Sequence, residues 1–216
     1  MRFLPACLLA LTLTSCSLTD EFSPNTVNGV PNVSVTESKN ARQHLASATR
    51  LFTAVRELPS LDCCDELPVL FTLSSDDVIL ELSSGRSFVK LIKLTPQLRR
   101  QDLTLTSLVS QTVLAPQVQF YTEDFLLIDS LTAYRYRPFS YREPDRLEIT
   151  LPLSQYHPPV YYMLVYTSQS EMDTYTPLLD IESKYDRSLG LDIMPRPWFI
   201  APHAPTGTLI LNRATK

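Results

Sequence analysis

The sequence predicts a mainly β fold: an antiparallel β-sandwich or jelly-roll-like domain, with an N-terminal amphipathic helix and a short helix near the C-terminus. Two observations favour this fold class. From Val69 onward the apolar residues fall in short runs with strand-like spacing, and the 17 prolines lie mostly between apolar runs. The helices that a parallel α/β sheet needs between its strands are absent from this pattern. Several short strands with rigid connections therefore explain the sequence best.

Residues 1–15 predict a lipoprotein signal peptide. Arg2 gives a positive start, and the apolar run from Phe3 to Leu13 has the length of a signal-peptide core, roughly 7 to 15 residues. The run ends in Leu13-Thr14-Ser15-Cys16, which resembles the bacterial lipobox, so we expect cleavage before Cys16 and lipidation of its thiol with acyl chains such as palmitate. An ordinary secretory peptide that leaves Cys16 as a free thiol is the alternative, although an exposed thiol is a liability in an oxidising compartment.

The mature N-terminus is expected to work as an anchor and a tether. Ser17 follows Cys16 with no Asp at that position, which resembles lipoproteins sorted to the outer membrane; we therefore expect a periplasmic protein held there by its lipid. Residues 16–35 are rich in Ser, Thr, Asn, Pro and Val without a clear period and read as a flexible tether. Residues 36–216 are long enough for a single domain with a sizeable core.

The first predicted element of this domain is an amphipathic helix over residues 37–58. Apolar residues recur there at steps of three and four, Ser34 and Glu37 have the spacing of a capping box, and Pro59 would stop the helix. The apolar residues of this stripe, which we expect to pack on the core, are Ala41, Leu45, Ala48, Phe52, Val55 and Leu58.

Eight short strands are predicted after the helix. The first two form a hairpin around Ser84-Gly85-Arg86. The predicted strands cover residues 78–82, 88–94, 103–109, 118–122, 125–129, 147–151, 161–166 and 208–211. One segment breaks this pattern, because Ser168 and Glu171 could cap a short helix over residues 169–176 that Pro177 ends or kinks, with a further turn near 179–185.

Cys63 and Cys64 are neighbours and have no further cysteine to pair with, because Cys7 lies in the predicted signal peptide and Cys16 is the predicted lipidation site. Two adjacent cysteines without further partners do not make a usual zinc site. A disulfide between the two neighbours, two buried thiols, and pairing with another chain or a redox role remain open alternatives.

No pattern in the chain points to catalysis, a metal or a cofactor. The nucleophile elbow, the zinc-protease helix, the phosphate-binding loop and the dinucleotide fingerprint are all missing. His44, His157 and His203 are widely separated and are expected to be surface or loop histidines, and the paired acids fall at turns, where they are usually solvated. With 19 Lys and Arg interspersed among 23 Asp and Glu, the chain also lacks the basic patch of a nucleic-acid-binding protein. We therefore expect a non-enzymatic protein with no cofactor and no metal.

The aromatic residues are the best candidates for ligand binding. Tyr134, Tyr136 and Tyr141 are interleaved with arginines in a stretch between strands, and Trp198 lies in the proline-rich segment before Phe199. Aromatic rings with nearby planar donors suit a carbohydrate platform. The alternative is that these rings alternate between core and solvent.

The order of several segments resembles the maltose-operon periplasmic protein family (MalM), over roughly residues 85–212. The resemblance implies a β-rich periplasmic protein linked to maltose or maltodextrin uptake, without established catalytic residues to carry over. The matching segments are Leu103–Ser107, Val113–Val118, Phe139–Tyr141, Asp145–Leu147, Leu164–Thr167 and Leu178–Asp180.

These observations lead to one main hypothesis and two rivals. The first is an envelope lipoprotein that assists maltose or maltodextrin transport, with a maltooligosaccharide or a porin as its partner. The second is a structural or assembly lipoprotein that docks on another envelope protein. Hydrolysis of a glycan is the third and weakest.

Overall fold

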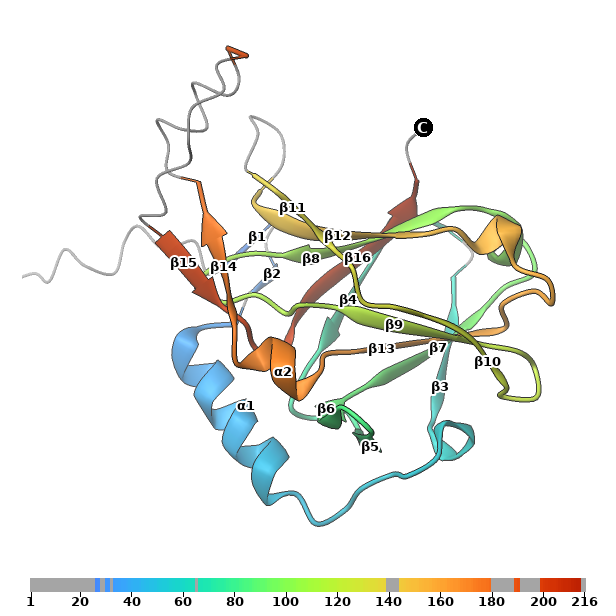
Figure 1. Cartoon of the computed structure of the whole chain (residues 1–216), viewed down its shortest axis with the longest axis horizontal. Helices are drawn as coiled ribbons and strands as arrows, with labels where there is room; N and C mark the ends of the chain where they lie inside the picture. Colours follow the sequence, from blue (N-terminus) through green and yellow to red (C-terminus); the bar gives the residue numbers. More distant parts are fainter. Residues whose placement is uncertain are drawn as a thin grey trace, which may run out of the picture.

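Two five-stranded sheets make up the body of the protein (Figure 1). The computed structural model describes residues 26–27, 30–31, 33–64, 66–138, 144–179, 189–190 and 199–214. Its strands far outnumber its helices in this part of the chain, so the predicted mainly β, sandwich-like fold is confirmed.

The first sheet has the order β10-β9-β13-β7-β3. Its strands are β10 (Leu127–Leu131), β9 (Gln117–Tyr121), β13 (Tyr162–Tyr166), β7 (Lys90–Leu94) and β3 (Ser60–Cys63). All neighbours are antiparallel except β3, which runs parallel to β7 with Ser60 opposite Leu91. The edge strand β3 was not predicted: its four residues alternate polar and apolar, but the run is short and its first three residues, Leu61 included, are exposed.

The second sheet is antiparallel throughout, in the order β11-β12-β8-β16-β4. Its strands are β11 (Arg135–Arg137), β12 (Arg146–Leu151), β8 (Leu103–Leu108), β16 (Gly207–Arg213) and β4 (Val69–Leu73). The central strands were predicted from their sequence. The short edge strand β11 lies inside the aromatic stretch that we expected to be a connection.

Inward-facing residues of the two sheets form one core. Phe120 and Met163 come from the first sheet and are fully buried, and they share a cluster with Leu105 and Leu209 of the second. Burying such side chains contributes about 1.5–3 kcal/mol each relative to exposure. This core explains why strand-like alternation was the strongest signal in the sequence.

The outer face of the first sheet is also covered. Leu91 and Leu164 point to this face and pack with Leu80 of the hairpin β5 (Ile79–Leu82) and β6 (Gly85–Phe88). A hairpin was predicted here, and its first strand agrees with β5, but its second strand is Gly85–Phe88, whereas most of the predicted 88–94 is the separate strand β7. Gly85 has a φ of +101°, a conformation that side chains disfavour, and a Cβ there would lie 3.0 Å from the Cβ of Gln169.

The predicted N-terminal helix is α1 (Val35–Ser47), and it is shorter than expected. The Ser34–Glu37 capping box is present, but the helix ends eleven residues before Leu58. Phe52 instead pairs its backbone with β5, since its N–H donates to the Ile79 carbonyl over 2.9 Å and its carbonyl accepts from Glu81 over 2.9 Å. The short 3-10 turn η1 (Val55–Glu57) follows. The second half of the apolar stripe therefore covers the sheet in an extended segment.

The second helix, α2 (Gln169–Met172), is likewise shorter than the predicted 169–176. Ser168 accepts from the Glu171 N–H as expected, but Pro177 lies within strand β14 (Tyr175–Leu178) instead of following the helix. β14 pairs with β15 (Phe199–Pro202), and the ribbon stands at one end of the sandwich (Figure 1). Neither strand was predicted, because prolines interrupt both.

The remaining described elements are small. The 3-10 turns η2 (Leu98–Arg100) and η3 (Leu153–Gln155) contact each other. The two-residue strands β1 (Thr26–Val27) and β2 (Val30–Pro31) pair within the segment predicted as a tether. No helix among the described residues is long and apolar enough to span a membrane. The predicted signal peptide, with Cys7, and the predicted lipidation site Cys16 lie outside the described residues, so the anchor and tether stay predictions.

Candidate functional site

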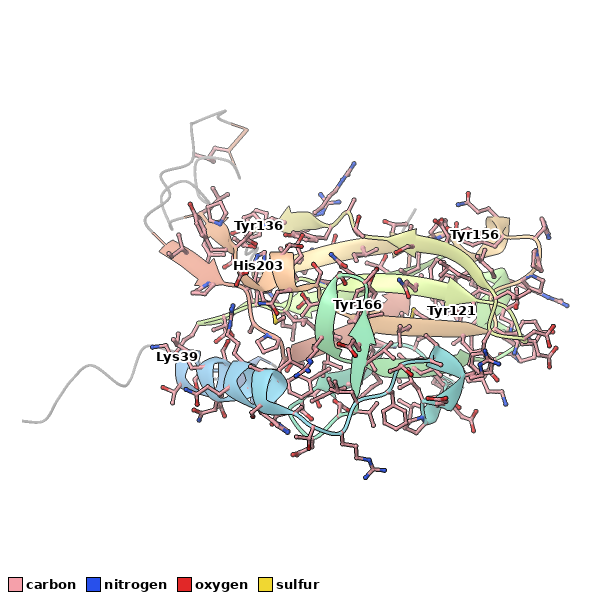
Figure 2. The ribbon with its side chains drawn as sticks, turned by 60° about the horizontal axis from the view of Figure 1, so that its bottom comes forward. Lys39, Tyr121, Tyr136, Tyr156, Tyr166 and His203 are labelled. Atoms are coloured by element: carbon pink, nitrogen blue, oxygen red, sulfur yellow. A yellow bond between two sulfur atoms is a disulfide. The ribbon has the colours of Figure 1, made fainter. Side chains whose placement is uncertain are left out.

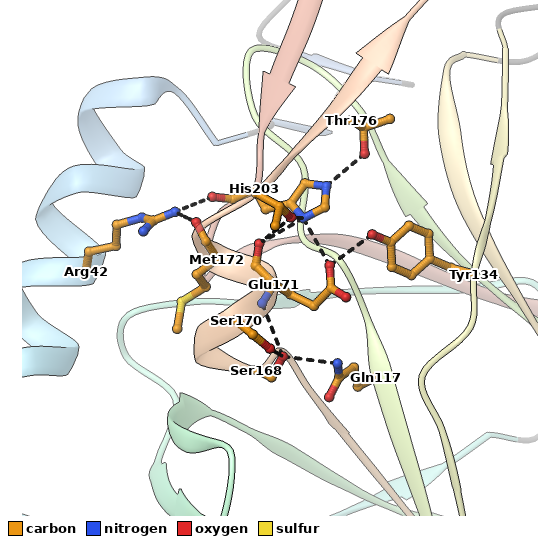
Figure 3. Close-up of polar contacts among 10 residues, drawn as sticks. Arg42, Gln117, Tyr134, Ser168, Ser170, Glu171, Met172, Thr176 and His203 are labelled. Atoms are coloured by element: carbon orange, nitrogen blue, oxygen red, sulfur yellow. Dashed lines mark hydrogen bonds and ion pairs between the residues drawn. The ribbon is translucent and has the colours of Figure 1, made fainter.

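His203 is the centre of a polar cluster that joins residues from several elements (Figure 3). It follows β15, and only 1% of its surface is exposed. The expectation of a surface or loop histidine was therefore wrong for this residue. The bridge between Val113 and His203 fixes its backbone. Figure 2 shows His203 and Tyr136 at one end of the sandwich and Tyr156 at the other.

Hydrogen bonds on both ring nitrogens fix the proton of His203. Nδ1 lies 3.0 Å from the Glu171 carbonyl oxygen, which can only accept, and 2.9 Å from the Thr174 hydroxyl, which already donates to that same carbonyl. Nδ1 therefore carries the proton. Nε2, 2.8 Å from the Thr176 hydroxyl, is then the acceptor. The neutral ring thus has a partner on each side.

The Glu171 carboxylate joins this cluster to Tyr134. Its Oε2 lies 3.3 Å from His203 Nδ1 and accepts a hydrogen bond of 2.9 Å from the Tyr134 hydroxyl. The Tyr134 ring meets the His203 ring edge-on, with centroids 6.1 Å apart. These three side chains hold together helix α2, the connection after β10 and the segment after β15.

Arg42 links α1 to the same cluster from the other side (Figure 3). Its Nη2 donates to the His203 carbonyl over 2.6 Å and to the Met172 carbonyl, and its Nη1 lies 3.5 Å from the Asp173 carboxylate. A planar guanidinium suits such a fork of acceptors. Arg42 thereby fixes α1 against α2 and the segment after β15.

Burial sets the protonation of the cluster. It lowers the pKa of His203, a shift that the nearby Glu171 carbonyl and carboxylate oppose and the Arg42 charge reinforces. Burial also raises the pKa of Tyr134, and its bond to the Glu171 carboxylate raises it further. At neutral pH the His203 ring is therefore uncharged, and the Tyr134 hydroxyl keeps its proton.

Two of the four proposed ligand-binding aromatics lie in or near this cluster. Tyr134 and Tyr136 are both half-buried and pack beside Leu147 and Ala201. The Tyr136 hydroxyl donates to the Asp145 carboxylate and accepts from the Leu179 N–H over 3.2 Å. Their hydroxyls are thus used inside the fold. Tyr141 and Trp198 lie outside the described residues, and ligand binding by any of the four stays a prediction.

Cys63 and Cys64 are joined in a disulfide at the end of β3, far along the chain from this cluster. They border an open pocket of about 350 Å³ together with Lys93 and Arg99. The Arg99 guanidinium lies 3.6 Å from the centroid of the Tyr161 ring, within cation–π distance. Sequence reasoning gave no sign of this pocket.

The His203 cluster has a structural arrangement: its contacts hold separate segments of the fold together. His203, Glu171 and Tyr134 find their partners within the fold, and the histidine faces two threonines instead of a more reactive nucleophile. Within the described residues, no group of three or more His, Cys, Asp or Glu could hold a metal ion. Sequence reasoning missed the cluster because Glu171 and His203 are 32 residues apart and His203 stands between Pro202 and Ala204-Pro205, a context typical of a loop.

Comparison with known proteins identifies the family. The model of a family described as maltose operon periplasmic protein precursor (MalM) matches residues 84–212, more than half of the 216-residue chain. The comparisons with curated proteins and with solved structures gave no match. The matched region begins in the turn between β5 and β6 and ends in β16, so it includes most of the sandwich as well as His203, Glu171 and Tyr134. On this evidence the chain belongs to the MalM family of maltose operon periplasmic proteins.

Proposed function

We propose that this protein is a periplasm-facing lipoprotein, held at the outer membrane through Cys16, that assists maltose or maltodextrin transport by binding the sugar without transforming it. The observation that carries the proposal is the family match over residues 84–212. The lipobox pattern at Leu13–Cys16 supports the anchor. Each CH₂ group of an acyl chain that enters the membrane contributes about 0.8 kcal/mol, and a single chain binds only marginally. Stable anchoring therefore requires the two or more acyl chains expected on Cys16.

The polar groups of the His203 cluster are bound to one another within the fold, and this supports a binding role for the protein over a catalytic one. A general base must reach a proton of the substrate within about 2.6–3.2 Å. Both ring nitrogens of His203 already have partners in the fold at comparable distances, and 1% exposure leaves no approach from solvent. Its Glu171 neighbour is likewise bound to Tyr134.

The anchor is tested by metabolic labelling with palmitate and separation of the two membranes. We expect the wild-type protein to carry the label and to be found in the outer-membrane fraction. The Cys16→Ser variant should carry no label and should be missing from that fraction. A matched Cys7→Ser variant should behave as wild type, because that residue is removed with the signal peptide. Label-free wild-type protein in the soluble periplasm would refute the anchor.

The sugar-binding part is tested by calorimetric titration of the full-length protein with maltopentaose, in a detergent without a sugar headgroup. We expect saturable binding, and chromatography afterwards should recover the pentasaccharide intact. Shorter sugars among the recovered products would contradict the non-enzymatic role.

A second candidate function, docking on another envelope protein, is favoured by one surface. Tyr175 is 59% and Ile200 55% exposed, and Ile200 is opposite Pro177 in the β14–β15 ribbon. Apolar side chains gathered on one projecting ribbon are typical of protein contacts. Photo-crosslinking from position 175 in intact cells should trap one defined protein, such as a porin, whereas position 124 in the β9–β10 turn should trap none.

A further inference from the structure

A cleft of about 680 Å³ lies outside the region that the family model matches. Its lining comes from the end of α1, the extended segment after it, and the turn between β4 and β5. In Figure 1 this segment leaves α1 and runs past the β5–β6 hairpin. Small-molecule sites usually have volumes of roughly 300–1,000 Å³, so the cleft has room for a ligand of several rings.

Backbone and ionic contacts hold the three walls of the cleft. Arg86 Nη1 donates to the Ala46 and Ala48 carbonyls over 3.1 and 3.3 Å, which fixes the end of α1. The pairing of Phe52 with β5 fixes the middle wall. In the third wall, Asp77 accepts from the Ser74 N–H over 2.8 Å and forms an ion pair of 3.0 Å with Lys90. A site with walls fixed in advance loses less entropy when it binds.

Three polar side chains on these walls are available to a ligand. His44, Arg50 and Asp76 are exposed and line the cleft. Within the described residues, no hydrogen bond or ion pair occupies the Arg50 guanidinium or the Asp76 carboxylate. The half-buried Phe52 and the Val78 side chain add an apolar wall beside them.

This combination fits a neutral ligand with many hydroxyls. Arg50 offers up to five N–H donors, and Asp76 offers two acceptor oxygens, so together they can bind both the oxygen and the hydrogen of hydroxyl groups. Because one full positive and one full negative charge face the same space, a strongly charged ligand would be repelled by one of them. The Phe52 and Val78 surfaces match the C–H faces of sugar rings.

We propose that this cleft is the maltodextrin-binding site, with Asp76 and Arg50 as its specificity-determining polar groups. The proposal rests on the proposed function for the identity of the sugar, and on the cleft for its place. It puts ligand binding at the N-terminal side of the domain, next to the segment that joins it to the predicted lipid anchor.

The test compares four variants of the full-length protein in the titration with maltopentaose. Asp76→Asn and Arg50→Gln should each raise the Kd at least about tenfold, because each removes a charged hydrogen-bond partner. Both side chains are exposed, so the melting temperature without sugar should stay unchanged. Asp124→Asn in the β9–β10 turn and Arg100→Gln in η2 are matched controls on exposed residues away from the cleft, and they should bind as wild type does.

The outcomes separate this proposal from the proposed function. If wild type binds and the Asp76→Asn/Arg50→Gln double variant binds within threefold of it, the cleft is overturned and the sugar-binding function stands. If wild type does not bind at millimolar maltopentaose, both are overturned.

Discussion

Replacing His203 by leucine tests whether the buried cluster holds this end of the sandwich together. Leucine has a similar volume but removes both ring nitrogens. The Thr176 hydroxyl, which is itself buried, loses its acceptor, and the Glu171 carbonyl loses one of its donors. A buried polar group left without a partner costs about 1–3 kcal/mol. We therefore expect the free energy of unfolding to fall by about 2–4 kcal/mol at pH 7.5.

The same variant should change the acid sensitivity of the fold. Burial lowers the pKa of His203 below its ordinary value of 6.5, so the unfolded chain binds the proton more tightly. The contribution of His203 to stability is then fully present above pH 6.5 and is lost as the pH falls below it. The difference in unfolding free energy between wild type and His203→Leu should accordingly be largest near pH 7.5 and shrink toward pH 5.

Urea unfolding followed by circular dichroism at several pH values measures both effects. For a domain of this size, 2–4 kcal/mol also corresponds to a melting temperature lower by roughly 4–16 °C. His44→Gln is the control, because that histidine is exposed on α1 and its replacement should leave the free energy of unfolding at pH 7.5 close to that of wild type. A loss below about 0.5 kcal/mol at pH 7.5, or one that does not shrink in acid, would refute the structural role of His203.

Three further predictions concern packing and ionisation. Tyr134→Phe removes the donor to the Glu171 carboxylate and should cost about 1–2 kcal/mol in urea unfolding; an unchanged midpoint would contradict this. Burial raises the pKa of Tyr121 to about 12, and burial together with the Glu171 carboxylate raises the pKa of Tyr134. Stability should therefore be full below pH 10 and fall above it, which thermal melts in alkaline buffers would reveal. Gly207→Ala places a Cβ 2.6 Å from the Leu114 Cβ and should cost about 1–3 kcal/mol; a melting temperature equal to that of wild type would show that the segment around Leu114 shifts without cost.

The fold was predictable where local patterns and tertiary packing agree. The central strands β8 and β12 alternate apolar and polar residues because one face of each lies on the core. The hairpin at Gly85 and the cap at Ser34 depend on residues within three positions of each other. Such short-range patterns can be recognised from a single sequence.

The prediction failed where spacing fits two structures equally well. Phe52, Val55 and Leu58 continue the helical steps of three and four, yet they pack on the outer face of the first sheet from an extended segment and a 3-10 turn. Nothing in the spacing alone separates these cases, because the competing partner is a strand some 30 residues later. Backbone pairing with β5 decided the outcome.

The candidate site was the least predictable part. Aromatic residues near position 134 attracted attention as a ligand platform, but the partners of Tyr134 and Tyr136 are carboxylates inside the fold. His203 gave a loop signal because of its prolines. The cleft near Asp76 was not anticipated either, since its walls come from three separate segments.

The central claim, that the protein binds maltodextrin, is tested most directly by thermal unfolding of the full-length protein with increasing maltopentaose. A ligand that binds only the folded state stabilises it by about 2.7 kcal/mol at 100 times its Kd, so the melting temperature should rise steadily with sugar concentration. The β-linked cellopentaose, equal in size and composition, should shift it much less. A melting temperature unchanged at millimolar maltopentaose would contradict the claim.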